Sequence, residues 1–157
     1  MLTFDPDGWC KDSTTGWCFA SWYCCPKNLT VHSAYVNDVK PWDSFHTYFN
    51  ISEDGATYTV SGTSARTAQA ASLLCPRQGR QMNWADVTLE VYAMSSCDLF
   101  SPSSMTFSDV ILWDTAYREL TPMWTLSPGS PCAGSITVDP EAHGSVHIEH
   151  STATSIE

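Results

Sequence analysis

The chain has 157 residues, which is enough for one compact domain with its own hydrophobic core. Its formal net charge of -10 repels phosphate backbones and anionic lipid headgroups, so nucleic acid and membrane surfaces are excluded as partners. No apolar run approaches the roughly 20 residues that span a bilayer. We therefore expect no membrane span.

The first element in chain order is a cysteine-rich segment over residues 1–27, which we expect to be irregular. The chain has seven cysteines and two sequons, Asn28-Leu29-Thr30 and Asn50-Ile51-Ser52. Disulfides persist in oxidising compartments, and sequons are used on the secretory route. The two signals together predict a secreted, extracellular protein glycosylated at Asn28 and Asn50. An odd cysteine count leaves one thiol for a partner chain, and sequence alone leaves the pairing open for Cys10, Cys18, Cys24, Cys25 and Cys75.

Alternating apolar and polar residues predict half-buried strands along most of the remaining chain. From 44 to 52, the alternation places Phe45, Thr47, Phe49 and Ile51 on one face, opposite His46, Tyr48 and Asn50. A turn is expected at 61–63, and over 65–74 a strand is favoured over a helix. Further alternation at 86–94, 105–113 and 146–148 predicts more strands, and 151–157 is expected to be a flexible tail. This pattern predicts a single all-β domain over residues 1–150, an antiparallel β-sandwich or jelly roll stabilised by disulfides.

Several short aromatic-rich motifs occur in a fixed order along these strands. The motifs are Trp17–Tyr23, Val36–Val39, Trp84–Tyr92, Cys97, Pro122, Trp124, Cys132, Val146 and Ile148. In this order the chain resembles the secreted fungal-type concanavalin-like β-sandwich proteins, which are distantly similar to the glutamic peptidases called eqolisins. The resemblance implies a disulfide between Cys97 and Cys132.

The resemblance to eqolisins also implies a catalytic candidate, Glu90. In that family a glutamate on the concave sheet works with a glutamine from the first third of the domain to activate water for peptide hydrolysis. A carboxyl on a shielded sheet face suits general acid and base work. Residues 1–44, however, contain no glutamine. We therefore favour a non-catalytic protein without a cofactor, and keep an eqolisin-like acid endopeptidase, or its inactive relative, as the alternative.

The seven tryptophans favour a binding module, because flat aromatic faces on a jelly-roll sheet stack on sugar rings. Trp42 and Trp17 lie in the loop-rich first part of the chain, and Thr88 and Tyr92 flank Glu90 on its polar face. These four residues are the predicted ligand contacts, and a glycan is the predicted ligand. Trp84, Trp113 and Trp124 are expected to pack in the core.

Other patterns give weaker hypotheses. His147 and Glu149 share a strand face at a spacing that can chelate zinc or copper, but an exposed polar strand face is the simpler interpretation, and we predict no metal site. Asp43, Ser44 and His46 have the residue types of a hydrolase triad, yet neighbours in one strand cannot form the relay. A third function class is extracellular assembly, in which an exposed sheet edge or an unpaired cysteine joins chains into an oligomer or filament.

Overall fold

A computed structural model of the chain describes residues 1–5, 7–24, 30–79, 81, 85–87, 104–126 and 134–149. Every regular element in these ranges is a β-strand, and every strand pair is antiparallel, which confirms the all-β prediction. Within these ranges no helix has the length and apolar character needed to cross a lipid bilayer. The chain divides into two compact units, Met1–Asn83 and Trp84–Glu157. Closure of the sheets into one sandwich domain over residues 1–150 stays a prediction.

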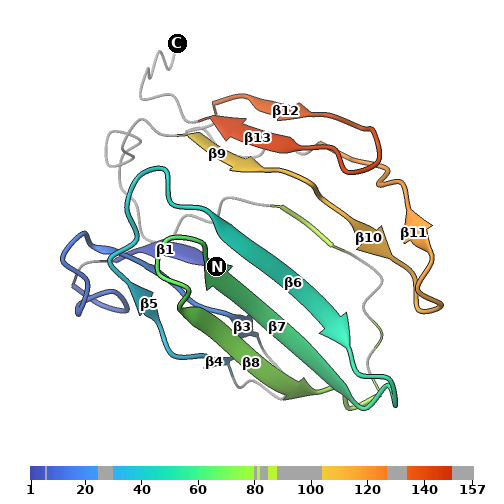
Figure 1. Ribbon diagram of the computed structural model, residues 1–157, viewed down its shortest axis with the longest axis horizontal. Coiled ribbons are helices and arrows are strands. Elements are labelled where there is room, and N and C mark those ends of the chain that lie inside the picture. Colours follow the sequence, from blue (N-terminus) through green and yellow to red (C-terminus); the bar gives the residue numbers. More distant parts are fainter. Residues whose placement is uncertain are drawn as a thin grey trace, which may run out of the picture. The chain divides into compact units, whose positions relative to one another are not determined.

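Three small sheets lie within the described residues of the first unit (Figure 1). The first has the order β1-β2-β5 and is built from β1 (Leu2–Phe4), β2 (Trp17–Phe19) and β5 (Val36–Asn37). The second pairs β3 (Trp22–Tyr23) with β4 (Val31–His32). The third has the order β6-β7-β8 and is built from β6 (Phe45–Ile51), β7 (Thr57–Ser64) and β8 (Ala70–Pro76).

The expectation of irregular structure over residues 1–27 is therefore wrong for three stretches, β1, β2 and β3. Each of these strands is two or three residues long, which is too short for an alternating pattern to show in the sequence. Two of the pairings that form them are distant along the chain: Leu2 pairs with Phe19, and Phe19 pairs with Val36.

The turn expected at 61–63 is also wrong, because Gly62 lies inside β7. A Cβ atom at Gly62 would lie 2.3 Å from the Cε1 and Cζ atoms of the Phe19 ring. The glycine is thus needed because the β7 backbone lies close to the Phe19 ring. The sequence does not distinguish a glycine with this role from a glycine in a turn.

Over residues 65–74 the preference for a strand is confirmed from Ala70 onward, where β8 begins. Residues 65–69 form the turn between β7 and β8, and Ala68 has a left-handed φ of 56° there. Of the alanines that suggest a helix, Ala65 and Ala68 lie in this turn, and Ala70 and Ala71 face opposite sides of β8, one exposed and one buried.

Two small hydrophobic clusters form the core of the first unit. One contains Phe19, Val36, Val39 and Ala71, and the other contains Tyr23, Tyr58 and Cys75. A disulfide joins Cys10 to Cys18, and both cysteines are fully buried. Burial raises the pKa of the Cys75 thiol, so this cysteine is poorly suited to pairing with another chain.

The described part of the second unit contains two sheets. One has the order β12-β13-β9 and is built from β12 (Ile136–Val138), β13 (Val146–Glu149) and β9 (Ser104–Phe107). The other pairs β10 (Leu112–Trp113) with β11 (Glu119–Leu120). Val146 and Ile148 are both buried, as their spacing predicts.

The strand expected over 105–113 is interrupted between β9 and β10, where Asp109 has a left-handed φ of 56°. The strand expected over 86–94 lies outside the described residues from Thr88 to Met94. The tail expected over 151–157 also lies outside them.

Candidate functional site

The most exposed tryptophan of the described chain lies in the connection between β5 and β6. We call residues Asp38–Ser44 the Trp42 loop. The Trp42 side chain is 97% exposed, and its φ of 71° is left-handed, as is the φ of 59° at Asp38. Left-handed backbone is unfavourable for residues other than glycine, so contacts around the loop must hold it in this shape.

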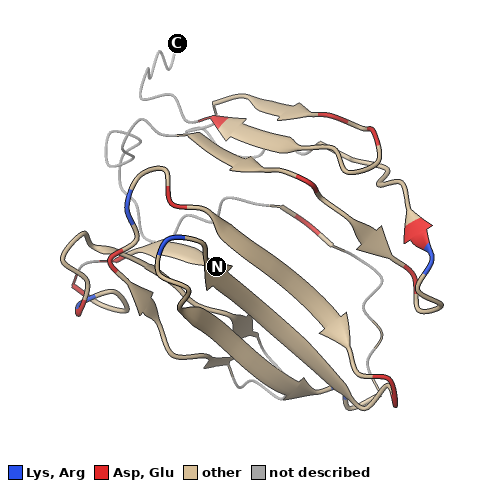
Figure 2. Ribbon diagram, viewed as in Figure 1, with Lys and Arg blue, Asp and Glu red and all other residues tan. Residues whose placement is uncertain are grey.

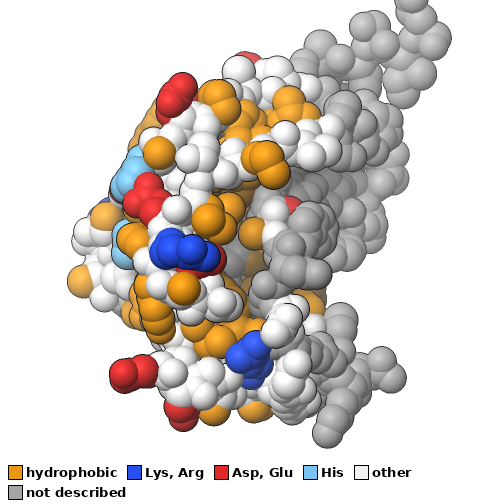
Figure 3. Space-filling view, turned by 90° about the vertical axis from the view of Figure 1, so that its right-hand side faces the viewer, with side chains coloured by type: hydrophobic (Ala, Val, Ile, Leu, Met, Phe, Trp, Pro, Cys, Tyr) orange, Lys and Arg blue, Asp and Glu red, His pale blue; other side chains and the backbone are white. Residues whose placement is uncertain are grey.

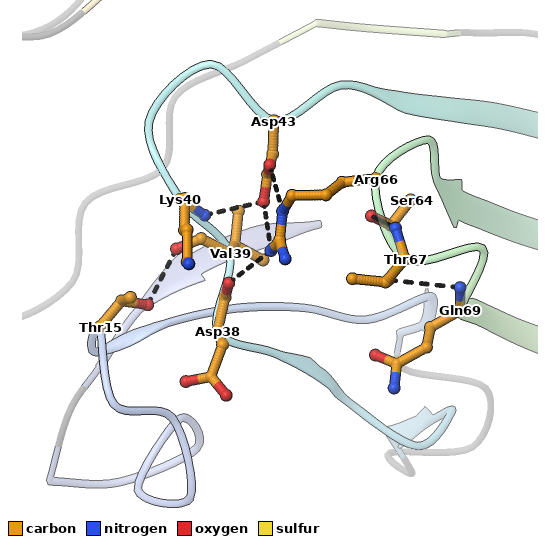
Figure 4. Close-up of polar contacts among 9 residues, drawn as sticks. All are labelled: Thr15, Asp38, Val39, Lys40, Asp43, Ser64, Arg66, Thr67 and Gln69. Carbon is orange, nitrogen blue, oxygen red and sulfur yellow. Dashed lines mark hydrogen bonds and ion pairs between the residues drawn. The ribbon is translucent and has the colours of Figure 1, made fainter.

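One such contact is a two-point ion pair between Arg66 and Asp43 (Figure 4). Arg66 Nε donates to Asp43 Oδ1 at 2.6 Å, and Arg66 Nη2 donates to Asp43 Oδ2 at 2.7 Å. Nη2 also donates to the carbonyl of Asp38 at 2.8 Å. The hydrogen bonds from Arg66 lower the pKa of Asp43 to about 2, so the pair stays charged well below neutral pH. Arg66 thereby ties the turn between β7 and β8 to both ends of the Trp42 loop.

A second set of contacts joins the loop to residues 13–15. The Thr14 amide donates to Asp38 Oδ1 at 2.6 Å, and the Thr14 hydroxyl donates to the same oxygen at 2.7 Å. The Thr15 hydroxyl donates to the carbonyl of Val39 at 2.8 Å. The hydrogen bonds from Thr14 lower the pKa of Asp38. Two separate segments thus fix the backbone that presents Trp42.

The chemistry available at the Trp42 loop is stacking. An indole has a large flat face and one donor, and it is normally at least partly buried. Here the loop holds it almost completely in water on a braced backbone. A ligand with a flat apolar face would bury the indole without first ordering the loop, and avoiding that ordering cost favours binding.

The other predicted ligand residues differ from Trp42. Trp17 is half-buried in β2, where it packs against the first core cluster and lies 5.0 Å from the ring of Phe4. The remaining predicted site residues lie outside the described part of the chain, except Asn50, which is exposed in β6. Those outside are Asn28, Thr88, Glu90, Tyr92, Cys97 and Cys132.

One expectation about a tryptophan is wrong. Trp113, expected in the core, is 57% exposed in β10. His32 is exposed in β4, and its ring centroid lies 4.8 Å from that of Trp22 and 4.9 Å from that of Tyr35. The β3–β4 register places Trp22 opposite His32, and this pairing was not visible in the sequence.

Trp9 extends this aromatic group to four rings, since its centroid lies 4.9 Å from that of Trp22. The indole nitrogen of Trp22 and the hydroxyl of Tyr35 are buried without a hydrogen-bond partner in the described structure. Burial raises the pKa of Tyr35, and the negative charge of Asp5 adds to the effect. Because both polar atoms are shielded from solvent, we regard this group as packing rather than as a ligand site.

The described members of the histidine and glutamate group near the end of the chain, His143, His147 and Glu149, have separate partners. His147 Nδ1 lies 2.8 Å from the Thr106 hydroxyl, and the Ser135 hydroxyl donates to Glu149 at 3.3 Å. Among residues with a described position, no three His, Cys, Asp or Glu side chains are arranged to hold a metal ion. His150 lies outside the described residues. Asp43, the acid of the hydrolase triad candidate Asp43, Ser44 and His46, forms an ion pair with Arg66 instead.

His143 instead bridges two carboxylates within the second unit. Its Nδ1 lies 2.6 Å from Asp109 Oδ1, and its Nε2 lies 3.1 Å from Glu119 Oε1. The hydrogen bond with Asp109 is the main cause of a raised His143 pKa, and the charge of Glu119 adds to it. The protonated imidazolium can donate to both carboxylates at once.

The bridge at His143 predicts a pH-dependent contact. Because the folded-state pKa lies above the ordinary value near 6.5, the contact contributes fully below that value and is lost as the pH rises through the folded-state pKa. We expect an NMR titration of the imidazole to show a raised pKa that falls in Asp109→Asn and falls less in Glu119→Gln. An unchanged His143 pKa in Asp109→Asn would contradict this assignment.

Comparisons with protein-family models, with curated proteins and with solved structures find no match to this chain.

Proposed function

We propose that this protein is a secreted, glycosylated and non-catalytic β-sandwich that binds glycans through Trp42. The supporting observation is the 97% exposed indole on a loop braced by Arg66 and Thr14. Sugar rings have apolar C–H faces that match the flat face of an indole, and their hydroxyls stay in water at the rim of such a contact. A braced aromatic residue on an antiparallel sheet protein suits this ligand class.

The chemical setting is compatible with the proposed location. The Cys10–Cys18 disulfide is weakly consistent with an oxidising compartment. Figure 3 shows hydrophobic side chains at the surface, with acidic, basic and histidine side chains beside them. Neutral glycans have no charge to repel, so the net charge of -10 does not oppose their binding.

Retention on neutral glycans tests the proposal. We expect the wild-type chain to bind members of an array of neutral oligosaccharides, and Trp42→Ala to bind about 30-fold more weakly, as for a central aromatic contact. Trp42→Phe should retain part of the affinity because it keeps a flat ring. Trp113→Ala is the matched control, since it removes another exposed tryptophan outside the Trp42 loop. Equal affinity of Trp42→Ala and wild type, or no binding to any glycan, would overturn the proposal.

The contacts that brace the Trp42 loop contribute separately to the affinity for the glycan. In Arg66→Met the aromatic face remains, but the loop must be ordered when the ligand binds. We expect a weakening of about three- to tenfold, smaller than that of Trp42→Ala.

A further inference from the structure

Among the described strands, β6 is an edge of its sheet. The amide of Ala65 donates to the carbonyl of Ser44, and the amide of Ser52 donates to the carbonyl of Thr57, both at 2.9 Å. In an antiparallel ladder these bonds recur at every second residue, so His46, Tyr48 and Asn50 bond to β7. The amides and carbonyls of the alternate residues point away from β7, and no strand in the described ranges pairs with them. Those residues are Phe45, Thr47, Phe49 and Ile51.

This edge lacks the usual protection against pairing with another chain. Edge strands are commonly blunted by charged side chains or proline. None of the residues of β6, β7 and β8 is charged, as Figure 2 shows, and β6 contains no proline. The other edge, β8, ends in Pro76, whose carbonyl accepts a hydrogen bond from the hydroxyl of Tyr23 at 3.5 Å. Of the two edges that the described strands show, β6 is therefore the one without a charge, a proline or a second neighbouring strand.

Asn50 is placed to supply a cover for this edge. It is exposed on β6 and begins the sequon Asn50-Ile51-Ser52. Residues two apart in a strand share a face at about 7 Å, so the side chain of Tyr48 lies next to that of Asn50. Tyr48 is 47% exposed, and its ring lies 6.3 Å from that of His46. The face beside Asn50 thus presents an aromatic surface to anything attached there.

We propose that Asn50 carries an N-linked glycan whose first sugar packs on Tyr48 and whose bulk covers the open edge of β6. The glycan comes from a lipid-pyrophosphate-linked oligosaccharide. The Asn50 side-chain nitrogen forms a bond to C1 of the first sugar, the C1–O bond to the pyrophosphate breaks, and the amide proton leaves with the pyrophosphate. The inference is independent of sugar binding at Trp42 and shares with the proposed function only the secretory location.

The first test is site occupancy and mass in solution. The full chain, secreted from eukaryotic cells, should show a glycan at Asn50 by glycopeptide mass spectrometry and should sediment as a monomer. Asn50→Gln should shift the mass to that of a dimer or larger species, because β6 can then pair with β6 of a second copy. Asn28→Gln is the matched control and should stay monomeric. Thr47→Lys added to Asn50→Gln places a charge on the edge and should restore the monomer.

The second test addresses the contact with Tyr48. Trimming the glycan to its first sugar should preserve the melting temperature of the wild type, whereas Asn50→Gln lowers it. In Tyr48→Ala the forms with and without that sugar should melt together. If the sugar changes the melting temperature equally with and without Tyr48, the packing is wrong.

The outcomes separate this inference from the proposed function. An unoccupied Asn50 beside an occupied Asn28 overturns the inference alone, and so does a monomeric Asn50→Gln. Absence of glycan at both sites overturns the inference together with the secretory location. Glycan-array binding by Trp42, measured on the same samples, reports on the proposed function whichever result is obtained.

Discussion

Replacing Gly62 by alanine is expected to lower the free energy of unfolding by about 2–3 kcal/mol. The new methyl group would lie 2.3 Å from two atoms of the Phe19 ring and 3.2 Å from Thr47 Cγ2. Phe19 is buried, and its ring stacks on that of Phe45 with centroids 4.6 Å apart, so it has little room to move. Alanine also restricts the unfolded chain, and this effect alone would stabilise the folded protein by about 0.4–1 kcal/mol. The steric cost of the new methyl group is larger.

Urea denaturation measures this effect. The control is Thr59→Ala, because Thr59 is half-buried in the same strand. We expect it to change the free energy of unfolding by about 0.5 kcal/mol or less. Phe19→Leu should recover part of the loss when combined with Gly62→Ala, because the two positions touch and their effects cannot be additive. A Gly62→Ala variant as stable as wild type would mean that the close approach to Phe19 is absent.

Removing the disulfide by the double substitution Cys10→Ala and Cys18→Ala is expected to cost about 2–3 kcal/mol of unfolding free energy. The two cysteines are eight positions apart, so the bond closes a short loop, and a short loop restricts the unfolded chain less than a long one. Both side chains are fully buried, and the bond holds the irregular residues after β1 against β2.

The disulfide prediction has a direct chemical check. A non-reducing peptide map should join the peptides of Cys10 and Cys18, and mild reduction should shift the urea midpoint of the wild type toward that of the double variant. A map that joins either cysteine to another position would contradict the assignment. If reduction shifts the urea midpoint of the double variant by a similar amount, the loss of stability on reduction comes from other cysteines.

Long alternating segments were predictable because their pattern repeats enough to be seen. Residues 45–51 show this, since the alternation over 44–52 predicts a strand and β6 spans Phe45–Ile51. The expected half-buried face is wrong there, because Thr47 is exposed and Phe49 is 50% exposed, while Phe45 and Ile51 at the ends of β6 are half-buried. Val146 and Ile148 are a second case, and their strand face does meet a core, since both residues are buried.

Features that depend on distant partners were not predictable. Glycine commonly marks turns, so Gly62 was assigned to one, whereas its role depends on a ring 43 positions earlier in the chain. The exposure of Trp42 was plausible from its loop-rich surroundings, but its brace is Arg66, from a different turn. Cys10 and Cys18 could not be matched because spacing alone does not determine connectivity.

The ion pair at the Trp42 loop has a consequence for the conditions under which the protein works. Because the folded-state pKa of Asp43 is depressed to about 2, its contribution is fully present above the ordinary carboxyl range and is lost only as the pH falls through about 2. Acidification from neutral pH to about pH 4 leaves this brace charged, while the His143 bridge gains its proton over the same interval. The Arg66–Asp43 ion pair therefore persists in an acidic medium and keeps bracing the Trp42 loop there.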